Sequence, residues 1–253
     1  MRTEVTDVDA LRHEIARACR VLAARRLADG ILGHISVRID DDHLLVRCRG
    51  PRERGLAFTE YADIRLVDLD GKGDLDGGYQ VPNELPLHTE VLRARPGVRT
   101  VIHAHPPAVV AADLAGIAIR PIIGAFDIPG TRLAEGGVPV YPRGILVRDR
   151  RLAAEMVEAM GDHPVVLLRA HGLTAVGGSP AQAVLRAISV DSIARLSLAV
   201  TGAGGTLVDL PDEDMAELPD LGSGFNEATA WRHEVARLDE ASAVCSGPVE
   251  FLL

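Results

Sequence analysis

One apolar segment that ends in two histidines constrains this chain more than any other feature. Residues 101–106 read Val-Ile-His-Ala-His-Pro, and a second proline follows. The apolar residues indicate the end of a buried β-strand, which the two prolines stop. Side chains two residues apart in a strand point to the same face, so His103 and His105 are expected side by side. That is the placement that two ligands of one metal ion need, although two ordinary polar residues at a strand end would look the same.

The composition predicts a globular chain with an aliphatic core. Of the 253 residues, 47% are hydrophobic and 25% are charged, while only 3% are aromatic. A net charge of -9 argues against a general nucleic-acid binder. There is no apolar run of membrane-spanning length and no apolar secretory signal at the N-terminus, and the three cysteines are scattered. We therefore expect a cytoplasmic protein whose partners include neither membranes nor nucleic acids.

Hydrophobic spacing predicts an α/β fold in one domain. Apolar residues at helical spacing predict helices over residues 7–28, 83–94, 107–114, 149–160, 179–200 and 226–238, with Asn83 as the N-cap of the second. Alternating or continuous apolar runs predict strands over 35–39, 44–46, 62–68, 98–103, 138–141, 164–169 and 173–176. Residues 117–123 suggest an edge strand or a loop, 124–137 an irregular segment, and 210–220 an acidic surface loop. The whole chain, 1–253, is expected to be a single domain with a C-terminal helical extension at about 206–253.

Two further residues strengthen the metal hypothesis. His171 follows a continuous apolar strand, and Glu84 stands where the second helix begins. Three imidazoles and a carboxylate that leave a position open describe a catalytic divalent-metal site better than a structural one. Glu84 could instead compensate the helix dipole. His88, one turn further on, could face the same way as Glu84 or lie in the helix packing.

Two loops are candidates for anion binding. Arg47, Arg49, Arg52 and Arg54 crowd around a Gly-Pro turn, where guanidinium groups could bind a carboxylate or phosphate. The alternative is a solvated charged loop. Gly33, which has no Cβ, could let the backbone approach an anion, or could simply form the turn between a helix and a strand.

Four motifs make the chain resemble the class II aldolase/adducin family over about residues 10–200. These motifs are Gly-His-Ile-Ser-Val-Arg at 33–38, Pro-Asn-Glu-Leu-Pro-Leu-His at 82–88, the His-Ala-His segment with Arg-Pro-Gly-Val before it, and Leu-Arg-Ala-His-Gly-Leu at 168–173. The resemblance implies a three-layer α/β/α fold around a central, mainly antiparallel sheet. It also implies one divalent metal ion per subunit on His103, His105 and His171, with Glu84 as the catalytic acidic residue that sometimes ligates the metal. Family members are commonly homotetramers with active sites between subunits. The donor set would suit Zn, Mn, Fe or Co.

The phosphate-binding elements of the family's sugar-phosphate aldolases are altered in this chain. Gly33-His34 replaces a Gly-Asn, the arginine-rich residues 47–55 replace a Thr-Gly loop, and Pro82-Asn83 replaces a Ser-Ser. The chain keeps the family's metal ligands but lacks its phosphate-binding residues. In this it resembles the family's decarboxylases, which act on hydroxylated aromatic acids such as dihydroxyphthalates. Glu84 or His34 could supply the proton. The predicted substrate contacts, for a small anionic substrate, are Gly33, His34, Ser36, Arg49, Arg52 and Asn83.

Three alternatives to that lyase remain open from the sequence. One is an aldolase or epimerase acting on a sugar or sugar phosphate. Another is a non-haem iron oxygenase on the same scaffold. The last is a non-catalytic, adducin-like interaction module, although adducin-type heads tend to lose the metal ligands that this chain keeps.

Overall fold

A seven-stranded, mainly antiparallel sheet organises the molecule. The computed structural model describes residues 7–219, 221 and 223–246. The sheet order is β3-β2-β1-β4-β7-β6-β5, and every neighbouring pair is antiparallel except β5 and β6. The strands are β1 (His34–Arg38), β2 (His43–Arg47), β3 (Ile64–Asp68), β4 (Thr100–Ala104), β5 (Val140–Tyr141), β6 (Val165–Leu168) and β7 (Gly172–Gly177).

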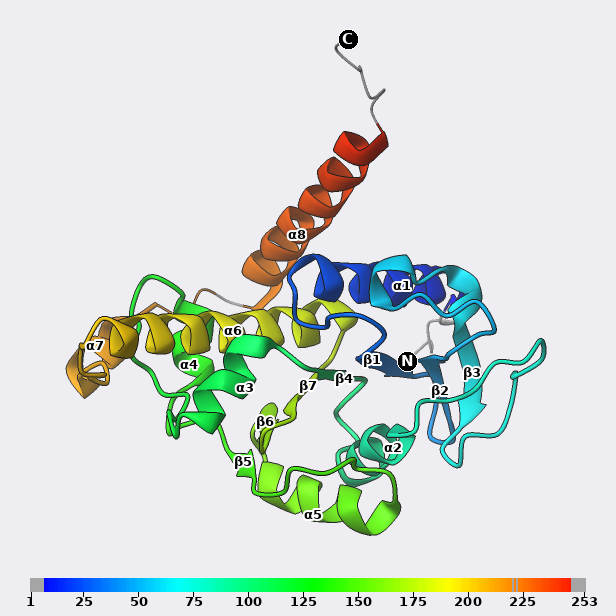
Figure 1. Cartoon of the computed structure of the whole chain (residues 1–253), viewed down its shortest axis with the longest axis horizontal. Helices are drawn as coiled ribbons and strands as arrows, with labels where there is room; N and C mark the ends of the chain where they lie inside the picture. Colours follow the sequence, from blue (N-terminus) through cyan, green and yellow to red (C-terminus); the bar gives the residue numbers. More distant parts are fainter. Residues whose placement is uncertain (1–6, 220, 222, 247–253) are drawn as a thin grey trace, which may run out of the picture.

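Helices cover both faces of this sheet (Figure 1). On one face lie α1 (Val8–Ala24), α3 (Pro107–Leu114) and α6 (Pro180–Gly202), and on the other lie α2 (Leu85–Ala94) and α5 (Arg150–Met160). Neighbouring strand residues contribute to different cores: Ile102 packs in the α1/α6 core and Val101 in the α2/α5 core. The predicted α/β/α fold is therefore confirmed. The same alternation directs His103, like Val101, toward the α2 side.

Several local predictions were wrong. Residues 124–137 contain the helix α4 (Ile128–Leu133), which Asp127 caps by accepting a hydrogen bond of 2.9 Å from the Gly130 N–H. The acidic segment 210–220 contains α7 (Asp212–Glu217), and three of the four acidic residues of this helix lie in its first turn, where they favour a helix. Both helices have only six residues, too few to show a hydrophobic period. The N-cap position of α2 is Glu84 rather than Asn83, and α1 ends at Ala24 instead of continuing to residue 28.

The remaining elements connect or extend the three layers. Residues 117–123 form a loop rather than an edge strand, and two short 3-10 helices, η1 (Leu56–Phe58) and η2 (Tyr61–Asp63), lie between β2 and β3. The helix α8 (Ser223–Ser246) extends beyond the body of the molecule (Figure 1) and contacts α1 and α6. There the Arg25 guanidinium pairs with both oxygens of Glu234. Residues 247–253 of the predicted extension lie outside the described residues. None of the described helices has the length and apolarity to cross a bilayer.

Candidate active site

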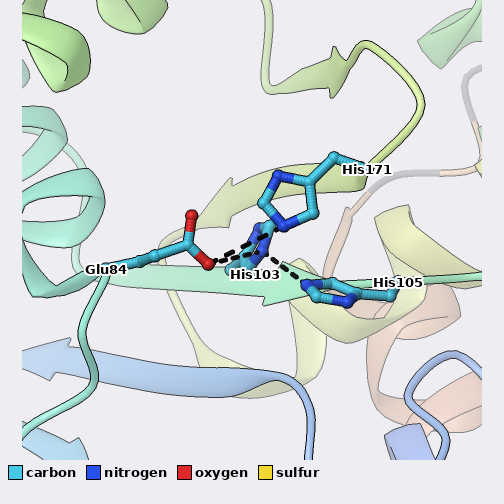
Figure 2. Close-up of side chains that lie close together, drawn as sticks. All are labelled: Glu84, His103, His105 and His171. Carbon is cyan, nitrogen blue, oxygen red and sulfur yellow. Dashed lines mark hydrogen bonds and ion pairs between the residues drawn. The ribbon is translucent and has the colours of Figure 1, made fainter. Parts of the chain in front are cut away.

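Four predicted ligands converge at one end of β4 (Figure 2). His103 is the last residue but one of the strand, His105 follows the strand, His171 lies in the turn between β6 and β7, and Glu84 precedes α2. One donor atom from each side chain lies within 4.8 Å of the other three. The Nε2 atoms of His103 and His105 are 2.7 Å apart. Glu84 Oε2 lies 3.4 Å from His103 Nε2 and 3.7 Å from His171 Nε2.

Backbone groups fix the orientation of two of these side chains. His103 Nδ1 lies 3.0 Å from the Leu173 carbonyl, which can only accept, so Nδ1 carries the proton and Nε2 presents a lone pair. The Val147 N–H donates to Glu84 Oε1 at 2.8 Å, which leaves Oε2 facing the histidines. Hydrogen bonds of this kind, made by the outer atoms of a ligand, orient metal ligands in proteins.

The protonation states also fit a divalent cation. Burial, followed by the charge of His103, lowers the pKa of His105 to about 3 and lowers that of His171 as well. Burial alone would raise the pKa of Glu84, but the nearby His103 ring, the hydrogen bond from the Val147 N–H and the His171 ring together lower it to about 2. Neutral imidazoles and an ionised carboxylate are the forms that bind metals. The four residues could therefore hold a divalent ion.

A strained turn places His171. Ala170 has φ of +53°, a left-handed conformation that costs a non-glycine residue about 1–2 kcal/mol. The Asp113 carboxylate, from α3, accepts a hydrogen bond of 2.7 Å from the Ala170 N–H. Its other oxygen lies 3.1 Å from Arg169 Nε. Asp113 therefore holds the turn that carries a ligand, and nothing in the sequence distinguishes it from other acidic residues on helices.

His34 lies beside the cluster because β1 pairs with β4. His34 and His103 are register partners, and their ring centroids are 5.1 Å apart. His34 Nδ1 is 2.6 Å from His88 Nε2, and His88 Nδ1 is 2.7 Å from the Ser36 hydroxyl. All three side chains are buried. The sequence left the direction of His88 open, and its spacing of one helical turn from Glu84 was the available signal.

The residues that the sequence predicts as substrate contacts differ in their exposure and in their partners. Gly33 has φ of +87°, and a Cβ there would lie 3.3 Å from the His103 carbonyl, so its lack of a side chain serves packing. Ser36 has no exposed surface and bonds to His88, so a direct substrate contact by Ser36 has no support in this geometry. Asn83 is exposed next to Glu84.

The four arginines of the loop also differ. Arg47 is buried and pairs with Glu53, and Arg54 is exposed and pairs with Glu60 at 3.2 Å. Arg52 is exposed. Arg49 is half-buried, is joined to Gln80 by two backbone hydrogen bonds, and makes no side-chain pair within the described part of the chain. Its charge is among those that lower the pKa of His34, after burial and the neighbouring histidines. One uncompensated cation of this loop therefore lies near the cluster.

The fold defines an enzyme of the class II aldolase type, with a cluster of four side chains that could hold a divalent metal ion, and the chain belongs to that family. The family model described as "Class II Aldolase and Adducin N-terminal domain" matches residues 13–198. The 3,4-dihydroxyphthalate decarboxylase of Arthrobacter keyseri is 73% identical over 234 residues, which cover 91% of this chain and 94% of that protein. The protein of the same name from Terrabacter sp. (strain DBF63) is 67% identical over 233 residues, 90% of this chain and 97% of that one. These relatives place the chain in the aromatic-acid decarboxylase branch.

A solved structure supports the fold independently. The aldolase II superfamily protein from Pseudomonas syringae superimposes with a TM-score of 0.78 at 22% identity, covering 94% of this chain and 96% of that one.

Proposed function

We propose that this protein is a divalent-metal-dependent decarboxylase of 3,4-dihydroxyphthalate or a close hydroxylated aromatic dicarboxylate. The observation that carries the proposal is the cluster of three histidines and Glu84 beside an uncompensated arginine, in a chain 73% identical to a decarboxylase of that substrate. A metal-binding cluster next to an unpaired cation suits a chelating dianion. The aldolase alternative has less support, because all three phosphate-binding elements of the family's sugar-phosphate aldolases are replaced in this chain.

His103, His105, His171 and Glu84 would hold the metal, which when bound supplies a Lewis acid for the hydroxyl and carboxylate oxygens of the substrate. The protein's own contribution is to place those four groups through the Leu173 carbonyl and the Val147 N–H. Burial shields His103 and Glu84 from water, while His105 and His171 are half-buried. Fixed groups shielded in this way strengthen the electrostatic interactions on which loss of CO₂ depends.

Arg49 is the residue that we propose for the second carboxylate of the substrate. Its backbone is anchored to Gln80, so the side chain starts from a fixed point. A guanidinium without an intramolecular partner can form two parallel hydrogen bonds to a carboxylate. Arg52, in the same loop, is exposed and would act at longer range.

The sequence predicts that Glu84 or His34 donates the proton that takes the place of the departing CO₂ on the aromatic ring. Burial and the neighbouring histidines lower the pKa of His34 well below its ordinary value, and the pKa of Glu84 is about 2. Neither group then carries an acidic proton at neutral pH, which argues against both as the acid.

The test is product analysis with purified, metal-loaded protein. We expect stoichiometric CO₂ and a dihydroxybenzoate from 3,4-dihydroxyphthalate, and no release from phthalate, which lacks the chelating hydroxyl. Release of an aldehyde from a ketose phosphate without any CO₂ from the aromatic acid would instead identify an aldolase. Oxygen uptake with Fe(II) and the aromatic acid would identify an oxygenase. Elemental analysis of the same sample would identify the metal among Zn, Mn, Fe and Co.

We further propose a cytoplasmic homotetramer with active sites between subunits. The support is the assembly common in this family and the absence of a span-forming helix among the described residues. Light scattering of the full chain would give the mass of the assembly. Mixing two differently inactivated variants would show whether neighbouring subunits complete one site.

A further inference from the structure

The chain of buried polar groups Ser36, His88 and His34 lies outside the cluster of Glu84 and three histidines, yet it ends beside that cluster. Both hydrogen bonds are short, 2.7 Å from Ser36 to His88 and 2.6 Å from His88 to His34. Ser36 and His88 have no exposed surface, and His34 is 5% exposed. Two of the three side chains come from β1 and the third from α2, so the sheet and the covering helix hold the chain from both sides.

The direction of these hydrogen bonds follows from the serine at the inner end. A hydroxyl has one hydrogen, and within the described residues the only acceptor for the Ser36 hydroxyl is His88 Nδ1. If Nδ1 donated instead, the buried hydroxyl hydrogen would have no partner, which is costly. The carbonyl of Val101 lies near the same ring and raises the pKa of His88, which favours the opposite direction. However, no hydrogen bond joins His88 to this carbonyl among the described residues, whereas the Ser36 hydroxyl lies 2.7 Å from His88 Nδ1.

The proton positions along the chain then follow in order. Because Ser36 donates to His88 Nδ1, the proton of the neutral His88 ring is on Nε2 and is donated to His34 Nδ1. The neutral His34 ring therefore carries its own proton on Nε2. This atom makes no hydrogen bond within the described part of the chain and is not one of the fully buried unpaired atoms, so it is accessible to a ligand.

We propose that Ser36 and His88 are positioning residues that fix His34 as a neutral hydrogen-bond donor, with its Nε2–H directed at an anionic oxygen of the substrate. This inference rests on the proposed function, and it replaces the expected role of His34 as the proton source. A neutral imidazole is suited to the task because it donates without adding a positive charge next to a cation site. The ring is 5% exposed and lies against the His88 and His103 rings, surroundings that disfavour a charged imidazole.

The first test reads the tautomers directly. Long-range ¹H–¹⁵N spectra of the full-length, metal-free protein at neutral pH should show the proton on Nε2 in both His34 and His88. Single His34→Gln and His88→Gln variants assign the signals. His163, whose two ring nitrogens lie 2.6 and 2.9 Å from backbone carbonyls, is an internal reference outside the cluster. A proton on Nδ1 of His34 would overturn the proposal.

The serine provides the sharpest variant, because Ser36→Ala removes one atom. It should leave His88 free to adopt either tautomer, so that the His34 signal splits or shifts toward the Nδ1–H form. An unchanged His34 tautomer in Ser36→Ala would show that the serine does not set the direction, and the proposal would fail.

Kinetics separate positioning from packing. His88→Gln keeps an amide N–H near the position of Nε2, whereas His88→Leu keeps only bulk. We expect His88→Leu to raise KM by about ten-fold or more with a smaller change in kcat, since the lost hydrogen bond is to a charged oxygen in ground and transition states alike. His88→Gln should stay within a few-fold of wild type. His43→Gln, which removes an exposed histidine paired with Asp40, is the matched control and should change neither constant.

Equal effects of Gln and Leu at position 88 would indicate packing alone and overturn the proposal. If His88→Leu fails to fold, the Ser36→Ala spectra and kinetics decide. If the wild-type protein releases no CO₂ from any hydroxylated phthalate, the proposed function fails, while the tautomer spectra still test the hydrogen-bond chain.

Discussion

The histidine cluster and the arginine loop look alike in the sequence, because each is a group of side chains that could bind a ligand. In the folded protein their side chains are arranged differently. In the cluster, His103, His105, His171 and Glu84 all point to one centre. In the loop, Arg47 forms an ion pair with Glu53, and Arg54 forms one with Glu60. Arg49 is the only half-buried arginine of the loop without an ion pair among the described residues.

The difference comes from what fixes each side chain. Strand periodicity and register determine where His103 points, and backbone groups then fix the side chains of His103 and Glu84. A loop has no such period, so the partner of each arginine depends on where acidic residues happen to fold. Residue type therefore predicts a site well on a strand end and poorly in a loop.

The largest expected effect comes from breaking the cluster itself. His105→Ala should abolish stoichiometric metal binding and lower kcat/KM by about 10³ or more, since a Lewis acid contributes several kcal/mol to the transition state. Elemental analysis and CO₂ release measure the two effects. The exposed His43→Ala is the control. A His105→Ala variant that keeps its metal and its activity would remove His105 from the site.

The next largest effect is expected at Asp113, which is not a predicted metal ligand but holds the turn that carries His171. Asp113→Ala removes the acceptor for the Ala170 N–H and should weaken metal affinity by about 10- to 100-fold, because His171 loses its fixed turn. Titration calorimetry of the metal-free protein gives the affinity. Arg169→Met removes only an exposed partner of Asp113 and should have little effect. Equal affinities for Asp113→Ala and wild type would show that the turn holds without Asp113.

The loop side of the comparison is tested by a matched pair of arginines. Arg49→Met should raise KM for the dicarboxylate by about ten-fold, the cost of one charge-assisted interaction. Arg54→Met, in which an exposed and already paired arginine is lost, should leave KM unchanged. The opposite ranking would mean that the outer arginines recruit the substrate.

The smallest effect is a pH dependence of stability. The pKa of His88 is about 3 in the folded protein, because of burial and the charge of His103, against an ordinary value of 6.5. Between these values the unfolded chain binds more protons, so stability falls as the pH falls below 6.5, by ~1.4 kcal/mol per pH unit for one such group. Urea unfolding of metal-free protein at pH 7 and 5.5 measures the slope. His88→Gln should make it shallower, and an unchanged slope would mean that other groups account for it.

The sequence was sufficient for the sheet and for the convergence of the cluster. Apolar periods located all seven strands, and the family resemblance supplied their antiparallel arrangement, which the structure confirms. It was not sufficient for α4 and α7, which are formed by caps and first-turn charges rather than by a hydrophobic stripe. Asp113 and the buried role of Ser36 depend on contacts between distant segments, which spacing along the chain does not encode.

The pairing of β1 with β4 has a consequence for how this enzyme could change its substrate. His34 stands directly across from His103 on a ladder whose neighbouring residues, Ile35 and Ile102, are buried in the opposite core. In the proposed site, one of these adjacent strands carries an ion-binding residue, and the other carries the residue that would recognise the substrate, at a distance set by the strand pairing. Exchange of residue 34 could alter what the site accepts without moving the ion-binding strand, which makes this position a natural point of divergence within the scaffold.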